Sequence, residues 1–177
     1  MANRSYLYAA DSKPTEVDNP RAVRCISEHR GDIPLAHKLM VGYGTTITQS
    51  MIWSPQIGIA ADYAKGAELL GGLLRAVGQG LEDDAEFAVC VDRTVAHLDK
   101  QRSEFFILET GEMVSVTDDD PVAAVQRLVS HEIPAVVARA EAAIAGRDDA
   151  WLAALRTDWQ AHFASFYSDT LYFSFPG

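Results

Sequence analysis

Segments with the pattern of strands and segments with the pattern of helices do not alternate regularly along this chain of 177 residues. Apolar residues at every second position indicate a strand with one buried face, and a spacing of three and four indicates an amphipathic helix. The strand-like segments are 4–10, 22–28, 45–53, the two arms of a hairpin within 103–118, and 169–177. The helix-like segments are 32–42, 61–80, 83–101, 118–146 and 148–169. Because strands often follow one another directly, we expect an α+β fold: one mostly antiparallel sheet of about five or six strands, packed with about five helices.

The helix over 61–80 has the most regular pattern. Its apolar residues step by four, three, four and three, which places them on one face. They are Tyr63, Ala67, Leu70, Leu74 and Val77. Gly66, Gly71 and Gly72 lie inside the same segment. Since each interior glycine costs about 1 kcal/mol of helix propensity relative to alanine, we interpret them as close-packing positions.

Three features predict how the second half folds. The stretch 103–118 predicts a hairpin whose tight turn lies at Glu109-Thr110-Gly111-Glu112. In the helix over 118–146, Pro134 predicts a break or kink. The alternation of Leu171, Phe173 and Phe175 at the end of the chain predicts a half-buried strand that joins the sheet.

Composition limits the class of protein. The length fits one globular domain over residues 1–177, and no stretch has the 18 apolar residues of a membrane span. The net charge of −10 argues against a nucleic-acid binder and against a membrane-surface protein. The first residues lack the pattern of a secretory signal, so we expect a cytoplasmic protein in which Cys25 and Cys90 are free thiols.

The stretch "CISEHRGDIPLAHKLM" over 25–40 contains a candidate ligand site formed by Glu28, His29, Asp32 and His37. Histidine titrates near neutral pH, so these residues have the side chains needed for general acid–base chemistry. A structural interpretation competes with this one. In it Asp32 caps the following helix and Pro34 lies in its first turn.

Three acidic runs precede predicted helices. They are Glu82-Asp83-Asp84, Asp118-Asp119-Asp120 and Asp148-Asp149. Acidic side chains at a helix start accept free N–H groups, which explains one residue per run but not the others. We therefore expect Glu82, Asp83, Asp84, Asp118, Asp119 and Asp120 to include a docking surface for a basic protein partner.

Motifs of common enzymes are absent. The chain contains no G-x-S-x-G, no H-E-x-x-H, and no glycine-rich phosphate loop in the required context. We therefore predict no cofactor and no metal site. We favour a binding protein over an enzyme, and the enzyme alternative stays open.

The opening "MANRSYLY" resembles the start of an uncharacterised family of small bacterial proteins. The stretches "ISEHRGDIPLAHKLM", "IGIAADYAKGAELLGGLL" and "DTLYFSFPG" are similar to the same family. The resemblance implies a bacterial protein with a single domain, and it implies no activity, because none is established for the family.

Two functional hypotheses follow from the sequence. In the first, the chain is a small acidic module that binds a protein, most concretely a bacterial immunity protein that neutralises a toxin with a basic domain. In the second, it is an enzyme or small-ligand binder with its site around residues 28–37. The sequence leaves the oligomeric state and the identity of any partner open.

Overall fold

A five-stranded antiparallel sheet forms the centre of the computed structural model, which describes residues 3–53, 57–117, 119–164 and 166–175. The strands are β1 (Arg4–Ala10), β2 (Val23–Arg30), β3 (Thr46–Thr48), β4 (Gly58–Asp62) and β5 (Phe105–Glu109). Their order across the sheet is β2-β1-β5-β4-β3, and every neighbouring pair is antiparallel. The predicted α+β class is confirmed, and the number of strands agrees with the prediction.

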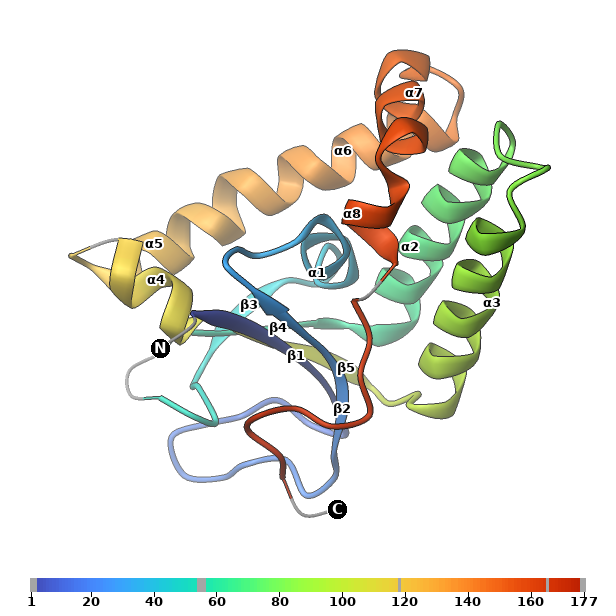
Figure 1. Cartoon of the computed structure of the whole chain (residues 1–177). Helices are drawn as coiled ribbons and strands as arrows, with labels where there is room; N and C mark the ends of the chain where they lie inside the picture. The colour runs from blue at the N-terminus through green and yellow to red at the C-terminus, as the bar shows by residue number, and fades with distance from the viewer. Residues whose placement is uncertain (1–2, 54–56, 118, 165, 176–177) are drawn as a thin grey trace.

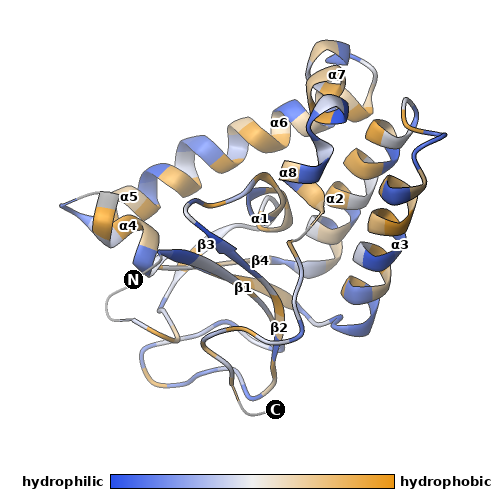
Figure 2. Cartoon of the chain, in the orientation of Figure 1, coloured by the Kyte–Doolittle hydropathy of each residue, from blue (hydrophilic) through white to orange (hydrophobic). Residues whose placement is uncertain are grey.

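Helices cover one face of this sheet (Figure 1). They are α1 (Leu35–Met40), α2 (Tyr63–Gly78), α3 (Ala85–Lys100), α6 (Ile133–Ile144), α7 (Asp149–Thr157) and α8 (Trp159–Phe163). The main core lies between these helices and the sheet side chains of Leu7, Ile59, Phe106 and Leu108. The apolar stripe predicted for 61–80 is the buried face of α2, and Figure 2 shows hydrophobic and hydrophilic residues alternating in bands along α2 and α6. No helix of the described ranges is long and apolar enough to cross a membrane.

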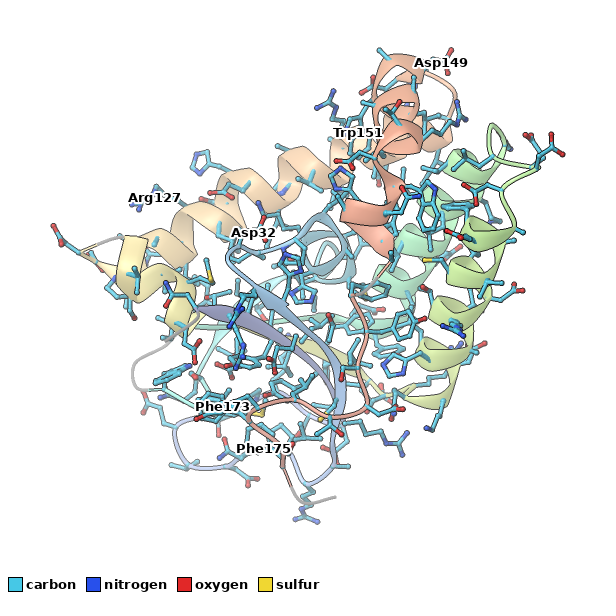
Figure 3. All side chains as sticks on the ribbon, viewed as in Figure 1. Asp32, Arg127, Asp149, Trp151, Phe173 and Phe175 are labelled. Carbon is cyan, nitrogen blue, oxygen red and sulfur yellow. The ribbon has the colours of Figure 1, made fainter. Side chains whose placement is uncertain are left out.

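The C-terminal tail covers the opposite face of the sheet. Leu171, Phe173 and Phe175 pack on Tyr6 and Tyr8 of β1, and Figure 3 places both phenylalanines beneath the sheet. The predicted strand over 169–177 is nevertheless wrong for its described part, because residues 169–175 form no strand. The backbone of residues 169–175 bonds to side chains, as when the Tyr8 hydroxyl donates to the carbonyl of Phe173 at 2.6 Å. Just before them, the Ser168 N–H donates to the carbonyl of Ile26 in β2 at 2.8 Å.

The predicted hairpin over 103–118 is half wrong. Its first arm is β5, but the chain then forms a helix, α4 (Gly111–Thr117). Thr110 starts this helix, since its carbonyl accepts the N–H groups of Met113 and Val114 at 2.9 and 3.0 Å. The Trp53 ring lies so close to Gly111 that a Cβ there would be 2.3 Å from it. Tertiary packing therefore overrides the strand preference of the β-branched residues.

Strand β4 is absent from the sequence prediction, and 45–53 contributes only the short β3. The first four residues of β4 are buried, on both faces of the sheet, and three of them are glycine or alanine, so they show no alternation. The chain passes directly from β4 into α2, where the Asp62 side chain caps the helix by accepting the N–H of Lys65 at 2.8 Å. A buried strand with no loop before the next helix resembles an extension of that helix.

Two long predicted helices are interrupted. The helix over 118–146 divides into α5 (Pro121–Arg127), a π-helical turn (Leu128–Glu132) and α6. The Ile133 N–H bonds the carbonyl of Leu128, five residues earlier, and Pro134 follows. A widened turn accommodates the missing N–H and the bulk of the proline ring, so the break predicted at Pro134 is confirmed. The helix over 148–169 divides into α7 and α8.

Candidate functional site

Glu28 and His29 are neighbours on β2, so their side chains point to opposite faces of the sheet. Glu28 lies on the face covered by the tail. Its carboxylate pairs with the Arg4 guanidinium at 2.9 Å and accepts the N–H of Tyr172 at 2.8 Å. Glu28 therefore holds the tail against the sheet, and the structure does not bring it together with the histidines of the predicted ligand site.

His37 is fully buried between two serines on the helical side of the sheet. Its Nε2 lies 2.7 Å from Ser27 Oγ, and its Nδ1 lies 3.1 Å from Ser5 Oγ. The Ser5 hydroxyl donates its proton to the carbonyl of Asp32 at 3.0 Å. Ser5 Oγ must then accept from His37 Nδ1–H, which leaves Nε2 to accept from Ser27. Burial, and secondarily the charge of His29, lowers the pKa of His37 to about 3, so the ring is neutral.

This chain of hydrogen bonds contains the residue types of a nucleophile and a base, but it is closed to solvent. Ser5 and Ser27 are each 0% exposed, as is His37 between them. A substrate has no route to a hydroxyl that is fully covered, and every donor in the chain already has an acceptor. The network therefore holds β1, β2 and α1 together, and it is satisfied without a ligand.

His29, which is half-buried, and Asp32, which is exposed, form the part of the predicted ligand site that solvent reaches. Their side chains pair at 2.7 Å, and the His29 ring lies edge-on to that of His37 with centroids 6.4 Å apart. The expectation that Asp32 caps α1 is wrong: the cap position is Pro34, and no side chain caps the helix. Asp32 instead borders a polar pocket of about 420 Å³ beside an ion pair of Lys38 with Glu132 at 3.2 Å. Figure 3 shows Asp32 above the sheet, near α1.

No group of three or more histidine, cysteine or acidic side chains is arranged to hold a metal ion within the described residues. Cys25 and Cys90 are free thiols, and burial raises the pKa of each. The Cys90 thiol donates to the carbonyl of Phe163 at 3.1 Å.

The first acidic run lies at the turn between α2 and α3. Asp84 caps α3 by accepting the N–H of Phe87 at 2.9 Å, and its second oxygen accepts the indole N–H of Trp159 at 3.0 Å. Glu82 and Asp83 are exposed, and no ion pair joins them to a basic residue of the part that the structure describes. Capping therefore explains one residue of this run and leaves two charges unused.

The second acidic run lies at the opposite end of the molecule, between α4 and α5 (Figure 1). Asp120 caps α5 by accepting the N–H of Ala123 at 3.0 Å, and Pro121 occupies the first helical position. Asp119 is exposed, and Asp118 lies outside the described residues. The two runs predicted as a docking surface therefore do not form one continuous patch.

Glu109, at the end of β5, is a fully buried acid that sequence reasoning assigned to a turn. Its carboxylate accepts the Ser50 hydroxyl at 2.5 Å and the N–H of Met51 at 2.7 Å. Ser50 Oγ also accepts the N–H of Trp53 at 2.7 Å. Burial raises the pKa of Glu109 to about 7, although both hydrogen bonds to the carboxylate lower it. The strand period could have indicated this acid, because Glu109 falls on the same face as Phe105 and Ile107.

Comparison with known proteins agrees with the resemblance seen in the sequence. No curated protein and no solved structure matches the chain. A family model matches residues 11–155, which leaves the opening and closing stretches outside the matched region. The match spans strands β2 to β5, the His37–Ser27 pair and the acidic turn between α2 and α3, whereas β1, which carries Ser5, lies before it. The chain belongs to the uncharacterised family described as a domain of unknown function, DUF7822.

Proposed function

We propose that this protein is a protein-binding module that recognises a basic partner through the turn between α2 and α3. The observation that carries the proposal is the excess of unpaired acid at this turn. Residues 82–93 contain five acidic side chains and one basic one. Glu82, Asp83 and Glu86 are all exposed, and none forms an ion pair with a described basic residue. Figure 2 shows the tip of this turn as hydrophilic.

Arg156 is a basic side chain beside this turn, but it does not neutralise the acidic residues. Arg156 lies against Gly80, where a Cβ would be 2.5 Å from its Nε. Its guanidinium donates to the carbonyls of Val77 and Ala76 at 2.9 and 2.8 Å, at the C-terminal end of α2. A cation at that end of a helix offsets the negative pole of the helix dipole. The charge of Arg156 is thus directed at the helix end, and the acidic side chains of the turn remain available.

Unpaired acids on one corner of an acidic protein favour rapid association with a basic surface. Complementary potentials raise association rates by one to three orders of magnitude at low ionic strength. In its most concrete form, the proposed module is an immunity protein that acts in the cytoplasm and blocks the basic cleft of a cognate toxin. A nuclease-type toxin is the clearest case, because a site that binds phosphate backbones must be basic.

Co-expression with the product of the adjacent gene tests the proposal. We expect the two proteins to elute as one complex in size-exclusion chromatography, and co-expression to relieve any toxicity of that product. A charge-neutralised variant (Glu82→Gln, Asp83→Asn and Glu86→Gln) should lose both effects at physiological salt. If the wild-type proteins elute separately and growth is not restored, the immunity function is rejected.

A further inference from the structure

A groove with an apolar floor runs beside the acidic turn, between the first half of α3 and the segment of α8 and the tail. Its volume is about 380 Å³, and its lining includes Val89, Trp159, Ala164 and Tyr167. Val89 is 49% exposed, whereas Trp159 is 4% exposed and forms the packed base. A branched apolar side chain left open beside two aromatic rings is a surface that gains from being covered.

The groove and the acidic turn are continuous. Ala85 and Glu86 line the groove, and they also line a hollow of about 480 Å³ over residues 80–86. The hydrogen bond from the Trp159 indole to Asp84, at 3.0 Å, holds the floor of the groove to the turn. Apolar side chains bordered by charged ones are the arrangement found in protein interfaces, and a floor fixed beforehand reduces the entropy lost on binding.

We propose that the groove and the acidic turn form one docking surface for an amphipathic segment of a basic protein. This inference rests on the proposed function and names the chemistry of the partner. An apolar side chain of the segment packs against Val89 and Tyr167. Lysine or arginine side chains next to it in the partner approach Glu82 and Asp83.

The distribution of charge also gives the segment a direction. Glu86 lies at the end of the groove that joins the turn, and Arg93 lies about two helical turns further along α3. A basic side chain is therefore attracted at the turn and repelled near Arg93. The basic residues of the segment lie on the side of its apolar anchor that faces the turn.

A second groove on α3 provides a matched control. It lies between α2 and α3, has a volume of about 360 Å³, and contains Val95 in its lining. Val95 is 45% exposed, close to the value for Val89. The charged residues of this groove balance, with two acids and two bases: Glu68, Asp99, Arg75 and Arg102. The two valines thus share a helix and a similar exposure, but the groove at Val89 joins the acidic turn, whereas the lining of the groove at Val95 contains no residue of that turn.

Substitution of each valine by aspartate tests whether the apolar groove contributes to binding in addition to the acidic charge. The probe is a fluorescent amphipathic helix of leucine and lysine, about 18 residues long so that it forms a helix on binding. Its affinity is measured by fluorescence anisotropy for the wild type, Val89→Asp and Val95→Asp. Both variants gain one negative charge, which by itself would tighten binding of a cationic peptide.

We expect Val89→Asp to weaken binding by about tenfold or more and Val95→Asp to change it by less than about twofold. A peptide of equal charge with serine in place of leucine should bind the wild type about tenfold more weakly. Equal affinities of the two variants, equal affinities of the two peptides, or no binding of the leucine–lysine peptide would each overturn the proposal. If Val89→Asp fails to fold by circular dichroism, the pair Val89→Gln and Val95→Gln makes the same comparison.

The same variants distinguish this inference from the proposed function. If the product of the adjacent gene binds Val89→Asp as tightly as Val95→Asp, the protein has a partner but docks it elsewhere, and the groove proposal is rejected. If that product binds neither the wild type nor the variants, the proposed function fails, whereas the peptide comparison still decides whether the groove binds an apolar anchor.

Discussion

Replacement of Glu109 by glutamine should make the protein more stable at neutral and alkaline pH. Glutamine keeps the shape of the side chain, so its oxygen can still accept the N–H of Met51. It removes the charge, which the fully buried site disfavours. The variant and the wild type should therefore be nearly equal in stability at low pH, where the carboxyl is protonated, and should separate as pH rises.

The magnitude follows from the pKa of the carboxyl in the two states. In the folded protein burial raises the pKa of Glu109 from 4.5 to about 7. Between these values the folded state holds a proton that the unfolded state has released, so stability falls as pH rises through this window. A pKa difference of about 2.5 corresponds to about 3 kcal/mol in the free energy of unfolding, and this contribution is lost in full above pH 7. The glutamine variant avoids this loss.

Urea denaturation followed by tryptophan fluorescence, at a series of values between about pH 4 and pH 9, measures the effect. The free energy of unfolding of Glu109→Gln minus that of the wild type should rise by about 3 kcal/mol across the series. Ser50→Ala removes a hydrogen bond that favours the ionised form, so it should extend the window upward. A difference between Glu109→Gln and wild type that does not change with pH would refute the reasoning.

Other substitutions test the packing and the second buried titratable group. Burial lowers the pKa of His37 to about 3, so the unfolded state binds the proton first and stability falls as pH drops below about 6.5. His37→Ala should remove this loss of stability at low pH and cost about 3 kcal/mol or more at pH 7, as read from urea titrations, because it leaves a cavity and leaves the buried Ser27 hydroxyl without its acceptor. Gly66→Ala should unfold the protein or lower its melting temperature sharply, since a Cβ there would be 2.0 Å from the Met40 carbonyl. Gly71→Ala meets only the end of the Arg75 side chain, at 3.4 Å, and should stabilise the protein by about 0.5–1 kcal/mol in the same thermal assay.

The sequence predicted the helices best where an apolar stripe repeats over several turns, as in α2. It failed where tertiary contacts decide between two local structures. Gly111 and Glu112 resemble a hairpin turn, but Glu112 accepts the Arg4 N–H at 2.9 Å and the Tyr6 hydroxyl at 3.0 Å. These bonds come from residues more than a hundred positions away, and no local pattern indicates them. In the tail, the alternation of Leu171 with Tyr172 correctly predicted which side chains are buried, although the backbone joins no strand.

The candidate ligand site shows why spacing along the sequence did not predict which of its residues lie together. A bulge in β2 shifts the register between Leu7 and Tyr8 of β1, so that Leu7 pairs with Ser27 and Tyr8 pairs with Cys25. Cys25 and Ser27 are two residues apart and would share a face in a regular strand, yet the bulge places them on opposite faces. The alternation in the sequence therefore could not predict that Ser27 lies on the same face of the sheet as His37. The acidic turn could be proposed from the surplus of charge in the sequence, whereas the groove beside it depends on α8, which is distant in sequence.

The association rate of the complex with the product of the adjacent gene tests the central claim most directly. The triple variant Glu82→Gln, Asp83→Asn and Glu86→Gln removes three charges at the turn. A control triple, Glu16→Gln, Asp18→Asn and Asp119→Asn, removes three exposed charges elsewhere. The account predicts that the turn variant associates about tenfold or more slowly at low salt, with a weaker salt dependence, while the control stays near the wild type. Equal association rates for the two triple variants would contradict it.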